Sequence, residues 1–249
     1  QREVYLQKLD TVQFNTVRVL PRLSCASCPA SVDFTLALEN VKSTGRRITA
    51  VAKYGSKRIG LGTRRVRRGT AEVFDGRLRL GRARLWPPKR PYLYPVKITV
   101  SSGGRTVGTY ELKSGVRAIK VSRGRLYLNG RPVNFRGVGV HEDTRSQGFA
   151  VDNAFRDRLV SEARAVGATV LRTHYPMHPH IHELADRLGL LIWSEIPVYA
   201  VKTQYLKREV VRKLAARELE SAVRTNWNHP SVMVWSIGNE LSARPGPVQ

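Results

Sequence analysis

The sequence predicts two regions of different fold class, an antiparallel β-sandwich followed by a unit in which strands alternate with helices. In residues 1–117, short runs alternate apolar and polar side chains, a period typical of strands that bury one face. From residue 118 to 249, helical periodicity alternates with apolar runs that suit strands buried on both faces. The 249 residues are 41% hydrophobic, enough for one large domain or two modest ones.

The predicted strands of the first region are separated by glycine-containing turn signals. These signals lie at residues 43–45, 75–76 and 102–104, and their spacing is typical of a sandwich. The CxxC pair, Cys25 and Cys28, precedes a strand-like run rather than a helix, so we expect two loop thiols or a local disulfide rather than a redox centre. The expected strands include residues 17–20, 34–38, 71–74, 78–80 and 92–100.

The second region opens with a predicted hairpin at residues 126–133, whose turn is Asn129-Gly130. Four strands then alternate with three helices, and such β-α-β units wind right-handed into a parallel sheet. A doubly wound sheet and a barrel both remain open, although no glycine-rich phosphate loop follows the first strand. The expected strands lie near 134–140, 169–173, 190–193 and 232–237, and the helices run from Asp152 to Gly167, up to Gly189, and from about 206 to 227.

Polar or ionisable side chains follow each of the four predicted strands. The carboxyl ends of parallel strands meet at one edge of a sheet or barrel, where active sites are built. Carboxylates, imidazoles and a guanidinium around one opening suit acid/base chemistry on a hydroxyl-rich, sugar-like substrate. They are His141, Glu142 and Asp143 after the first strand, Arg172 and His174 at the second, Glu195 after the third, and Asn239 and Glu240 after the fourth.

Metal binding is the competing interpretation of this cluster, because its imidazoles and carboxylates could also serve as ligands. No HExxH pair fixes such ligands on a helix face. His178, His180 and His182 alternate within the predicted second helix, where positions two apart do not share a face. We therefore expect no catalytic metal.

The formal net charge of +24 suggests either a polyanion-binding protein or cations spread over solvated faces. Lys and Arg occur along the whole length, with one dense cluster at residues 64–68. No zinc-finger, helix-turn-helix or aromatic-rich sheet pattern accompanies them, so we expect no nucleic-acid partner. No apolar run is long enough to cross a bilayer, so we expect no membrane partner, and the sequence assigns no compartment.

Short motifs recur along nearly the whole chain in an order typical of one enzyme family. They are Leu85-Trp86-Pro87 with Pro91-Tyr92-Leu93-Tyr94, Leu128-Asn129-Gly130-Arg131-Pro132-Val133, His174-Tyr175-Pro176, Asn228-His229-Pro230, and Gly238-Asn239-Glu240. This set resembles glycoside hydrolase family 2, the β-galactosidase, β-glucuronidase and β-mannosidase family. The resemblance implies an immunoglobulin-like β-sandwich over residues 1–117, followed by the first half of a (β/α)8 TIM barrel over residues 118–249.

The resemblance also implies a role for each residue at the barrel mouth. Glu240 would be the general acid/base, and Asn239 would bind the sugar 2-hydroxyl. His141, Arg172 and His174 would line the sugar subsite. Glu195 is expected among the substrate-binding residues; it occupies the place of a magnesium ligand in some members. The histidine that those members carry two residues later is Pro197 here, so we expect no cofactor.

The implied activity is that of a retaining exo-β-glycosidase acting on terminal β-linked sugars, β-galactosidase-like first and β-glucuronidase-like next. Such an enzyme needs a nucleophilic carboxylate besides its acid/base. The family takes that carboxylate from a late barrel strand, and a jelly-roll domain precedes the sandwich. We therefore expect this chain to be an inactive fragment of a longer parent enzyme. The expected partner is a carbohydrate substrate, and the full-length parent could form a homo-oligomer. The alternative is a non-catalytic carbohydrate- or polyanion-binding remnant.

Overall fold

The computed structural model describes residue 4 and residues 6–241, which form two compact units. The first unit is Val4–Val133, and the second begins at Asn134. This division falls after the hairpin predicted at residues 126–133. The domain boundary that the sequence predicts, between residues 117 and 118, stays a prediction. No helix in the described part of the chain is long and apolar enough to span a membrane.

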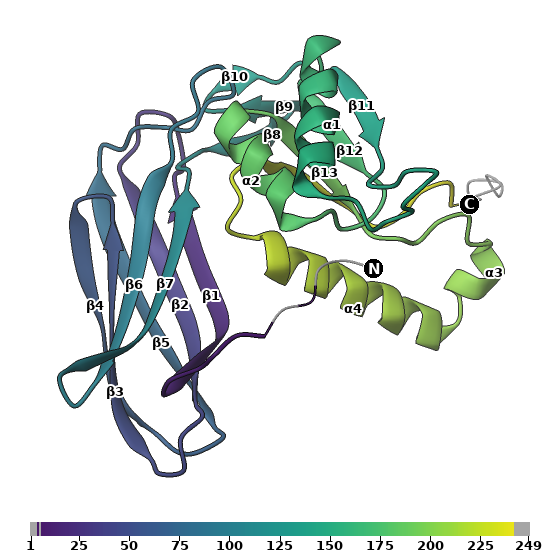
Figure 1. Cartoon of the computed structure of the whole chain (residues 1–249). Helices are drawn as coiled ribbons and strands as arrows, with labels where there is room; N and C mark the ends of the chain where they lie inside the picture. Colours follow the sequence, from purple (N-terminus) through teal and green to yellow (C-terminus); the bar gives the residue numbers. More distant parts are fainter. Residues whose placement is uncertain (1–3, 5, 242–249) are drawn as a thin grey trace. The chain divides into compact units, whose positions relative to one another are not determined.

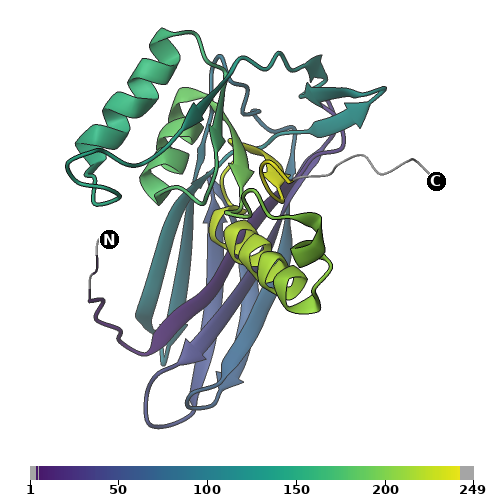
Figure 2. The ribbon, with the colours of Figure 1, turned by 90° about the vertical axis from the view of Figure 1, so that its right-hand side faces the viewer.

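Two antiparallel sheets form the sandwich of the first unit (Figure 1). One sheet has the strand order β1-β2-β5 and the other β4-β3-β6-β7. The strands run lengthwise through the sandwich, as a second view also shows (Figure 2). Their bounds are β1 Val12–Arg22, β2 Ala30–Asn40, β3 Arg46–Tyr54, β4 Lys57–Val66, β5 Ala71–Gly81, β6 Tyr94–Ser102 and β7 Arg105–Ser114.

The sandwich core arises from the period of two along each strand. Alternate residues of β2, such as Phe34 and Leu36, are fully buried, and so are Ile48 and Ala50 of β3. All belong to one apolar cluster drawn from both sheets. Burying each large apolar side chain contributes about 1.5–3 kcal/mol. The alternation in sequence thus fixes which face of each sheet becomes the core.

The turn that the sequence predicts at Asp75-Gly76 is wrong, because both residues lie inside strand β5. A Cβ on Gly76 would come within 2.9 Å of Leu61 Cδ2 and 3.2 Å of Ile59 Cδ1 on β4. Side chains of the other sheet therefore fill the space that a larger residue would need. The glycine marks a close approach between sheets, one of the meanings that glycine has within strands.

The predicted Asn129-Gly130 hairpin is confirmed. Both residues have positive φ, 52° and 78°, as a type I′ turn requires. The side chain of Asn129 also accepts a hydrogen bond from Ala118 N (2.9 Å) and donates one to the carbonyl of buried Trp86 (3.1 Å). The hairpin sheet is ordered β10-β9-β8, with β8 Ile119–Ser122, β9 Arg125–Leu128 and β10 Arg131–Pro132.

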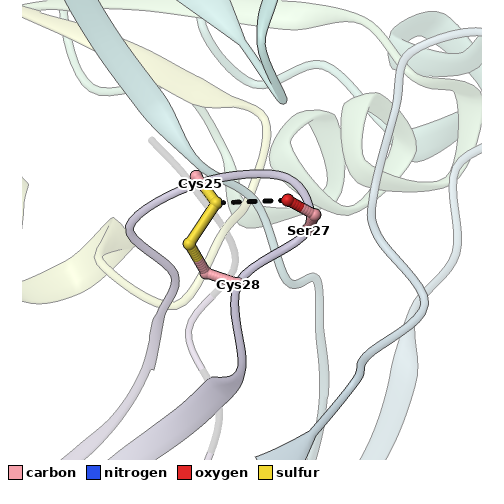
Figure 3. Close-up of a disulfide and its surroundings, with 3 residues drawn as sticks. All are labelled: Cys25, Ser27 and Cys28. Carbon is pink, nitrogen blue, oxygen red and sulfur yellow. Dashed lines mark hydrogen bonds between the residues drawn. A yellow bond between two sulfur atoms is a disulfide. The ribbon is translucent and has the colours of Figure 1, made fainter.

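Cys25 and Cys28 form a disulfide in the loop between β1 and β2 (Figure 3). The Cα atoms are 5.1 Å apart, and Cys28 N donates to Cys25 O across the same turn (3.0 Å). Of the two sequence expectations, the local disulfide is the one found. A bridge that closes so short a loop removes little entropy from the unfolded chain, so it rigidifies the loop more than it stabilises the sandwich.

Asp33 makes the stability of the sandwich depend on pH. Its carboxylate accepts hydrogen bonds from Arg77 Nε (2.5 Å) and Arg22 Nε (2.9 Å). The bond from Arg77 is the main cause that lowers the pKa of Asp33. A folded-state pKa below the unfolded value gives stability that is present above about pH 4 and is lost as the pH falls. We expect Asp33→Asn to lower the free energy of unfolding at pH 7, and urea titrations should find a smaller difference at pH 3. An equal difference at both pH values would contradict this role of the carboxylate.

The second unit contains a four-stranded parallel sheet with the order β11-β12-β13-β14 (Figure 1). As predicted, Asp152 caps the first helix by accepting from Phe155 N (2.8 Å), and Gly189 ends the second in a left-handed conformation. The predicted long helix is α4, with the short α3 before it. The bounds are β11 Gly137–Val140, α1 Asn153–Ala165, β12 Val170–Thr173, α2 Pro179–Leu188, β13 Leu191–Glu195, α3 Thr203–Leu206, α4 Glu209–Asn226 and β14 Val232–Ser236.

The two faces of this parallel sheet differ in burial. One face presents Leu171 and Ile192 to a buried cluster that includes residues of α1 and α2. The register places Arg172, Trp193 and Val234 in one row on the other face. The side chain of Arg172 is 39% exposed and Trp193 is 37% exposed. Parallel sheets are normally covered on both faces, so this face is the one open to further structure.

Candidate functional site

The ends of the four parallel strands bring one row of polar side chains together. Glu195 on β13 pairs with Ser236 on β14. Gly139 of β11 pairs with Arg172 of β12, and His141 and His174 lie two residues beyond these partners. Because side chains alternate along a strand, both histidines lie on the same face as Arg172. The rings of the two histidines stack at 5.0 Å between centroids. The row therefore lies on the open face of the sheet, at the mouth that the sequence predicts.

Glu195 is the centre of the row, and its carboxylate is buried at 1% exposure. His174 Nδ1 lies 3.1 Å from Oε1, and Ser236 Oγ donates to Oε2 over 2.8 Å. Arg172 Nη2 donates to both carboxylate oxygens, at 3.2 and 3.0 Å. A buried carboxylate is tolerated only when it is paired and hydrogen-bonded. These three neighbours meet that requirement, so Glu195 holds Arg172 and His174 in place.

Arg172 links this carboxylate to Asn239 in the loop after β14. Its Nη2 also donates to Asn239 Oδ1 over 2.6 Å. The amide oxygen of Asn239 is thereby used as an acceptor, which leaves the amide NH2 group as a hydrogen-bond donor. Donors of this kind can bind a hydroxyl oxygen of a sugar. That Asn239 contacts substrate stays a prediction.

The backbone on either side of Asn239 is held by the loop that follows β13. Asn239 N donates to Val198 O (2.9 Å), and Ala200 N donates to Asn239 O (3.0 Å). Ala200 has φ 51° and Glu240 has φ 49°, a left-handed conformation uncommon for residues other than glycine. Backbone strain of this kind persists where surrounding contacts determine it and is frequent at functional sites. The two loops together thus fix the direction in which Glu240 leaves the strand.

Gly238 is required for this close approach of the two loops. A Cβ at this position would lie 2.8 Å from the backbone oxygen of Val198. We expect Gly238→Ala to displace Asn239 and Glu240 and to destabilise the fold by about 1–3 kcal/mol, the usual cost of overpacking. The matched control is Gly60→Ala on β4, where nothing lies within 4 Å of the added atom. Thermal unfolding of both variants measures the difference, and equal destabilisation would contradict the clash.

Glu240 is exposed, and it carries no hydrogen bond or ion pair among the described residues. It follows Asn239 directly and lies within two residues of Gly238, whose carbonyl accepts from Ser236 Oγ (3.3 Å). Of the predicted site residues, Glu195 contacts Arg172 and His174, and Arg172 also contacts Asn239. His141 joins them by stacking, whereas Glu240 is placed by its backbone alone.

The other carboxylate at the mouth, Glu142, is held in the protein interior. It is 2% exposed and accepts from Arg156 Nε (2.7 Å) and His178 N (2.7 Å). Arg156 on α1 is itself 1% exposed. The backbone N of Glu142 donates to the hydroxyl of Tyr175 (2.8 Å). Glu142 thus ties the segment after β11 to α1 and to the start of α2.

The described residues hold no group of three or more side chains arranged to bind a metal ion. Magnesium does not fit at Glu195, because the guanidinium of Arg172 already supplies the positive charge at its carboxylate. The alternating histidines also separate: His178 caps α2 by accepting from His180 N, His180 lies 2.8 Å from Asp157, and His182 is fully buried.

Sequence reasoning missed Ser236, Gly238 and Arg156. Ser236 could have been found from strand parity, since it lies on the same face as Val234 at the end of β14. The clash that requires Gly238 depends on Val198 O, a contact between loops that no local pattern reports. Arg156 lies on the same buried face of α1 as Val160 and Ala163, and no local pattern indicates that Glu142 is its partner.

Comparisons with known proteins identify the family of the chain. Residues 12–117 match the model of "Glycosyl hydrolases family 2", and residues 119–246 match that of "Glycosyl hydrolases family 2, TIM barrel domain". The chain is similar to the β-glucuronidase of Paenibacillus borealis, at 32% identity over 184 residues, covering 70% of this chain and 31% of the relative. It is also similar to the β-glucuronidase of Rattus norvegicus, at 32% over 181 residues, with 70% and 28% covered.

Solved structures give the same picture. A putative β-galactosidase from Bacteroides fragilis superposes with a TM-score of 0.79 at 25% identity, covering 92% of this chain and 34% of that structure. The β-glucuronidase of Parabacteroides merdae gives a TM-score of 0.78 at 25% identity, with 92% and 30% covered. The chain spans about 30% of the length of the curated relatives that it matches. Matches to both family models over consecutive segments establish that the chain belongs to glycosyl hydrolase family 2.

Proposed function

We propose that residues 134–241 form part of the active site of a retaining exo-β-glycosidase, with Glu240 as its general acid/base. The observation that supports this most strongly is the placement of Asn239 and Glu240 beside the Arg172–Glu195 network at the carboxyl end of β14. Glu240 is exposed and has no salt-bridge partner in the described part of the chain, which suits a side chain that exchanges a proton with substrate in acid/base catalysis.

In this proposal each site residue has a defined task. Glu240 protonates the departing glycosidic oxygen and then removes a proton from the water that completes hydrolysis. Asn239 donates its amide N–H to a sugar hydroxyl while its oxygen stays bound to Arg172. The stacked rings of His141 and His174 line the sugar subsite, and Glu195 orients His174 rather than reacting with the sugar.

The nucleophile is proposed to lie outside the 249 residues. A retaining mechanism needs a second carboxylate about 5–5.5 Å from the acid/base, free to attack the anomeric carbon. Glu195 is occupied by Arg172 and Ser236, and Glu142 by Arg156. Ion pairing of this kind lowers the availability of a carboxylate as a nucleophile. Neither of these buried carboxylates is therefore assigned that role.

We also propose that the parallel sheet is the first half of a (β/α)8 barrel and that the sandwich is immunoglobulin-like. The row on the open sheet face, with Arg172 and Trp193 partly exposed, would become the barrel interior once further strands close around it. Apolar side chains on α4 support the same view, since Val210 is 62% and Leu214 54% exposed. Exposed apolar positions one helical turn apart suit packing against a neighbouring helix.

The proposed substrate is a terminal β-linked sugar, with glucuronides to be tested before galactosides. Curated relatives that match the chain are named β-glucuronidases, and one matched structure is a putative β-galactosidase. The sequence alone placed the β-galactosidase activity first. Both substrates therefore belong in the assay.

The test compares two polypeptides with chromogenic β-glucuronides and β-galactosides. One is the 249-residue chain, and the other is a longer polypeptide in which the same residues continue into a closed barrel. We expect turnover by the longer polypeptide and none by the 249-residue chain. Turnover by the 249-residue chain that Glu240→Gln abolishes would place the nucleophile within these residues and overturn that part of the proposal. Absence of turnover in the longer polypeptide would favour the non-catalytic binding alternative.

A further inference from the structure

We propose that the outward face of the sheet β4-β3-β6-β7 binds a linear acidic polysaccharide. The outward positions follow from the strand registers, because paired residues share a face and alternate residues of each strand face the buried core. Cations dominate this face, and the register leaves Glu111 as its acidic residue. The cations are Arg47, Lys53, Arg58, Arg65, Lys97 and Lys113, all exposed.

Like charges lie directly opposite one another across these strands. Arg47 pairs with Arg65, and Lys53 pairs with Arg58 on one side and Lys97 on the other. Cations that face each other across a strand pair destabilise a sheet. An anion that contacts two or three of them at once would relieve this repulsion. The two rows, Arg47/Arg65 and Arg58/Lys53/Lys97, are therefore suited to binding negative charge.

In the other sheet of the sandwich, β1-β2-β5, a carboxylate lies between two of the cations. There Asp33 lies between Arg22 and Arg77 and pairs with both. On the β4-β3-β6-β7 face, only Lys97 has a carboxylate partner among the described residues, Glu111 at 2.8 Å. Asp33 thus offsets part of the positive charge on one sheet, whereas most cations on the β4-β3-β6-β7 face have no carboxylate partner among the described residues. The difference cannot be attributed to the overall charge of the chain, because both sheets share it.

The spacing of the rows indicates the length of the ligand. Lys53 lies six residues beyond Arg47 on β3, which corresponds to about 20 Å along a strand. Between the rows, Thr49 and Thr63 lie side by side with their hydroxyl oxygens 2.8 Å apart. A ligand that contacts both rows must be extended, must carry repeated anions and must present groups that hydrogen-bond hydroxyls. A polyuronate chain has all three properties, and the arginine fork fits its carboxylates.

Nucleic acid suits this face less well. The outward positions of the four strands carry no aromatic side chain, whereas single-stranded nucleic acids bind by stacking bases on aromatic rings. The described part of the first unit contains no helix that could enter a major groove. The inference goes beyond the proposed hydrolase function, because it concerns a different unit and predicts binding without turnover.

The test is binding of polygalacturonate to the 249-residue chain, measured by affinity electrophoresis or calorimetry at low and high salt. The first variant carries Arg47→Thr, Lys53→Thr, Arg58→Thr and Arg65→Thr, substitutions that keep a good strand former at exposed positions. We expect its affinity to fall by about tenfold or more, since each exposed charge pair contributes modestly. Removal of opposed like charges should leave the melting temperature unchanged or higher.

The matched control removes the same charge elsewhere, with Arg158, Arg164, Arg212 and Arg217 each changed to Gln on exposed helix positions. It should keep the wild-type affinity. Equal loss in both variants would mean that net charge alone drives binding and would overturn the proposal. So would the absence of polygalacturonate binding to wild type, or equally tight binding of a DNA oligonucleotide through the same four residues. Weak binding of monomeric galacturonate and none of neutral dextran are the supporting results.

Discussion

Replacing Glu240 by Gln in a polypeptide with a closed barrel is expected to lower kcat by about 10²–10⁴-fold, the usual contribution of a positioned acid/base. Gln keeps the size of the side chain but can neither protonate the leaving oxygen nor accept a proton from water. Glu240 is exposed and carries no ion pair among the described residues, so the change should leave the melting temperature unaltered. Steady-state turnover of a β-glucuronide and thermal unfolding measure the two effects.

The control for this experiment is Glu218→Gln. Glu218 is an exposed glutamate of α4, and the chemical change is the same. It should leave kcat at the wild-type value. A loss of less than tenfold in Glu240→Gln, or an equal loss in Glu218→Gln, would remove Glu240 from the reaction.

Breaking the buried ion pair between Arg156 and Glu142 is expected to have the largest effect on stability. The two side chains are 1% and 2% exposed, with 2.7 Å between Arg156 Nε and Glu142 Oε1. Arg156→Met leaves the Glu142 carboxylate buried without its cation, which typically costs about 3–5 kcal/mol. Chemical denaturation of the second unit, followed by the fluorescence of its tryptophans, measures the change.

The double variant Arg156→Met/Glu142→Gln separates the pair from simple loss of packing. It removes both charges, so it should recover a large part of the stability lost in Arg156→Met. If the double variant is as unstable as Arg156→Met, the cost comes from lost packing and other hydrogen bonds of Arg156, such as that to Asn153 Oδ1 (2.8 Å). Recovery of stability would establish Glu142 as a structural carboxylate.

Local patterns in the sequence predict much of this fold. The alternation of apolar and polar residues along strands locates the sandwich core. Asn129-Gly130 identifies the hairpin between β9 and β10, because only a few residues accept the positive φ of that turn. Asp152 and Gly189 mark helix ends by the same kind of local chemistry. The error at Asp75-Gly76 has an instructive cause. A turn and a close approach between sheets both require glycine, and the sequence alone does not separate them.

The sequence predicts which residues lie at the candidate site better than it predicts which of them contact each other. The position of His174, Glu195 and Asn239 at strand ends is enough to bring them to one mouth. Which of them contact depends on strand register and on the loops after β13 and β14. The register places Glu195 opposite Ser236, and the loop after β13 pairs with Asn239. These relations join residues about 40 positions apart, and no local pattern reports them.

The leaving-group dependence of Glu240→Gln tests the central claim most directly. Two β-glucuronides are compared, one that releases an acidic nitrophenol and one that releases an alkyl alcohol of high pKa. Only the alcohol needs a proton from the general acid as it departs. We predict that the rate of glycosyl transfer to the enzyme, measured before the steady state, falls far more for the alkyl substrate than for the nitrophenyl substrate. An equal fall for both would contradict the assignment of Glu240 as the acid/base.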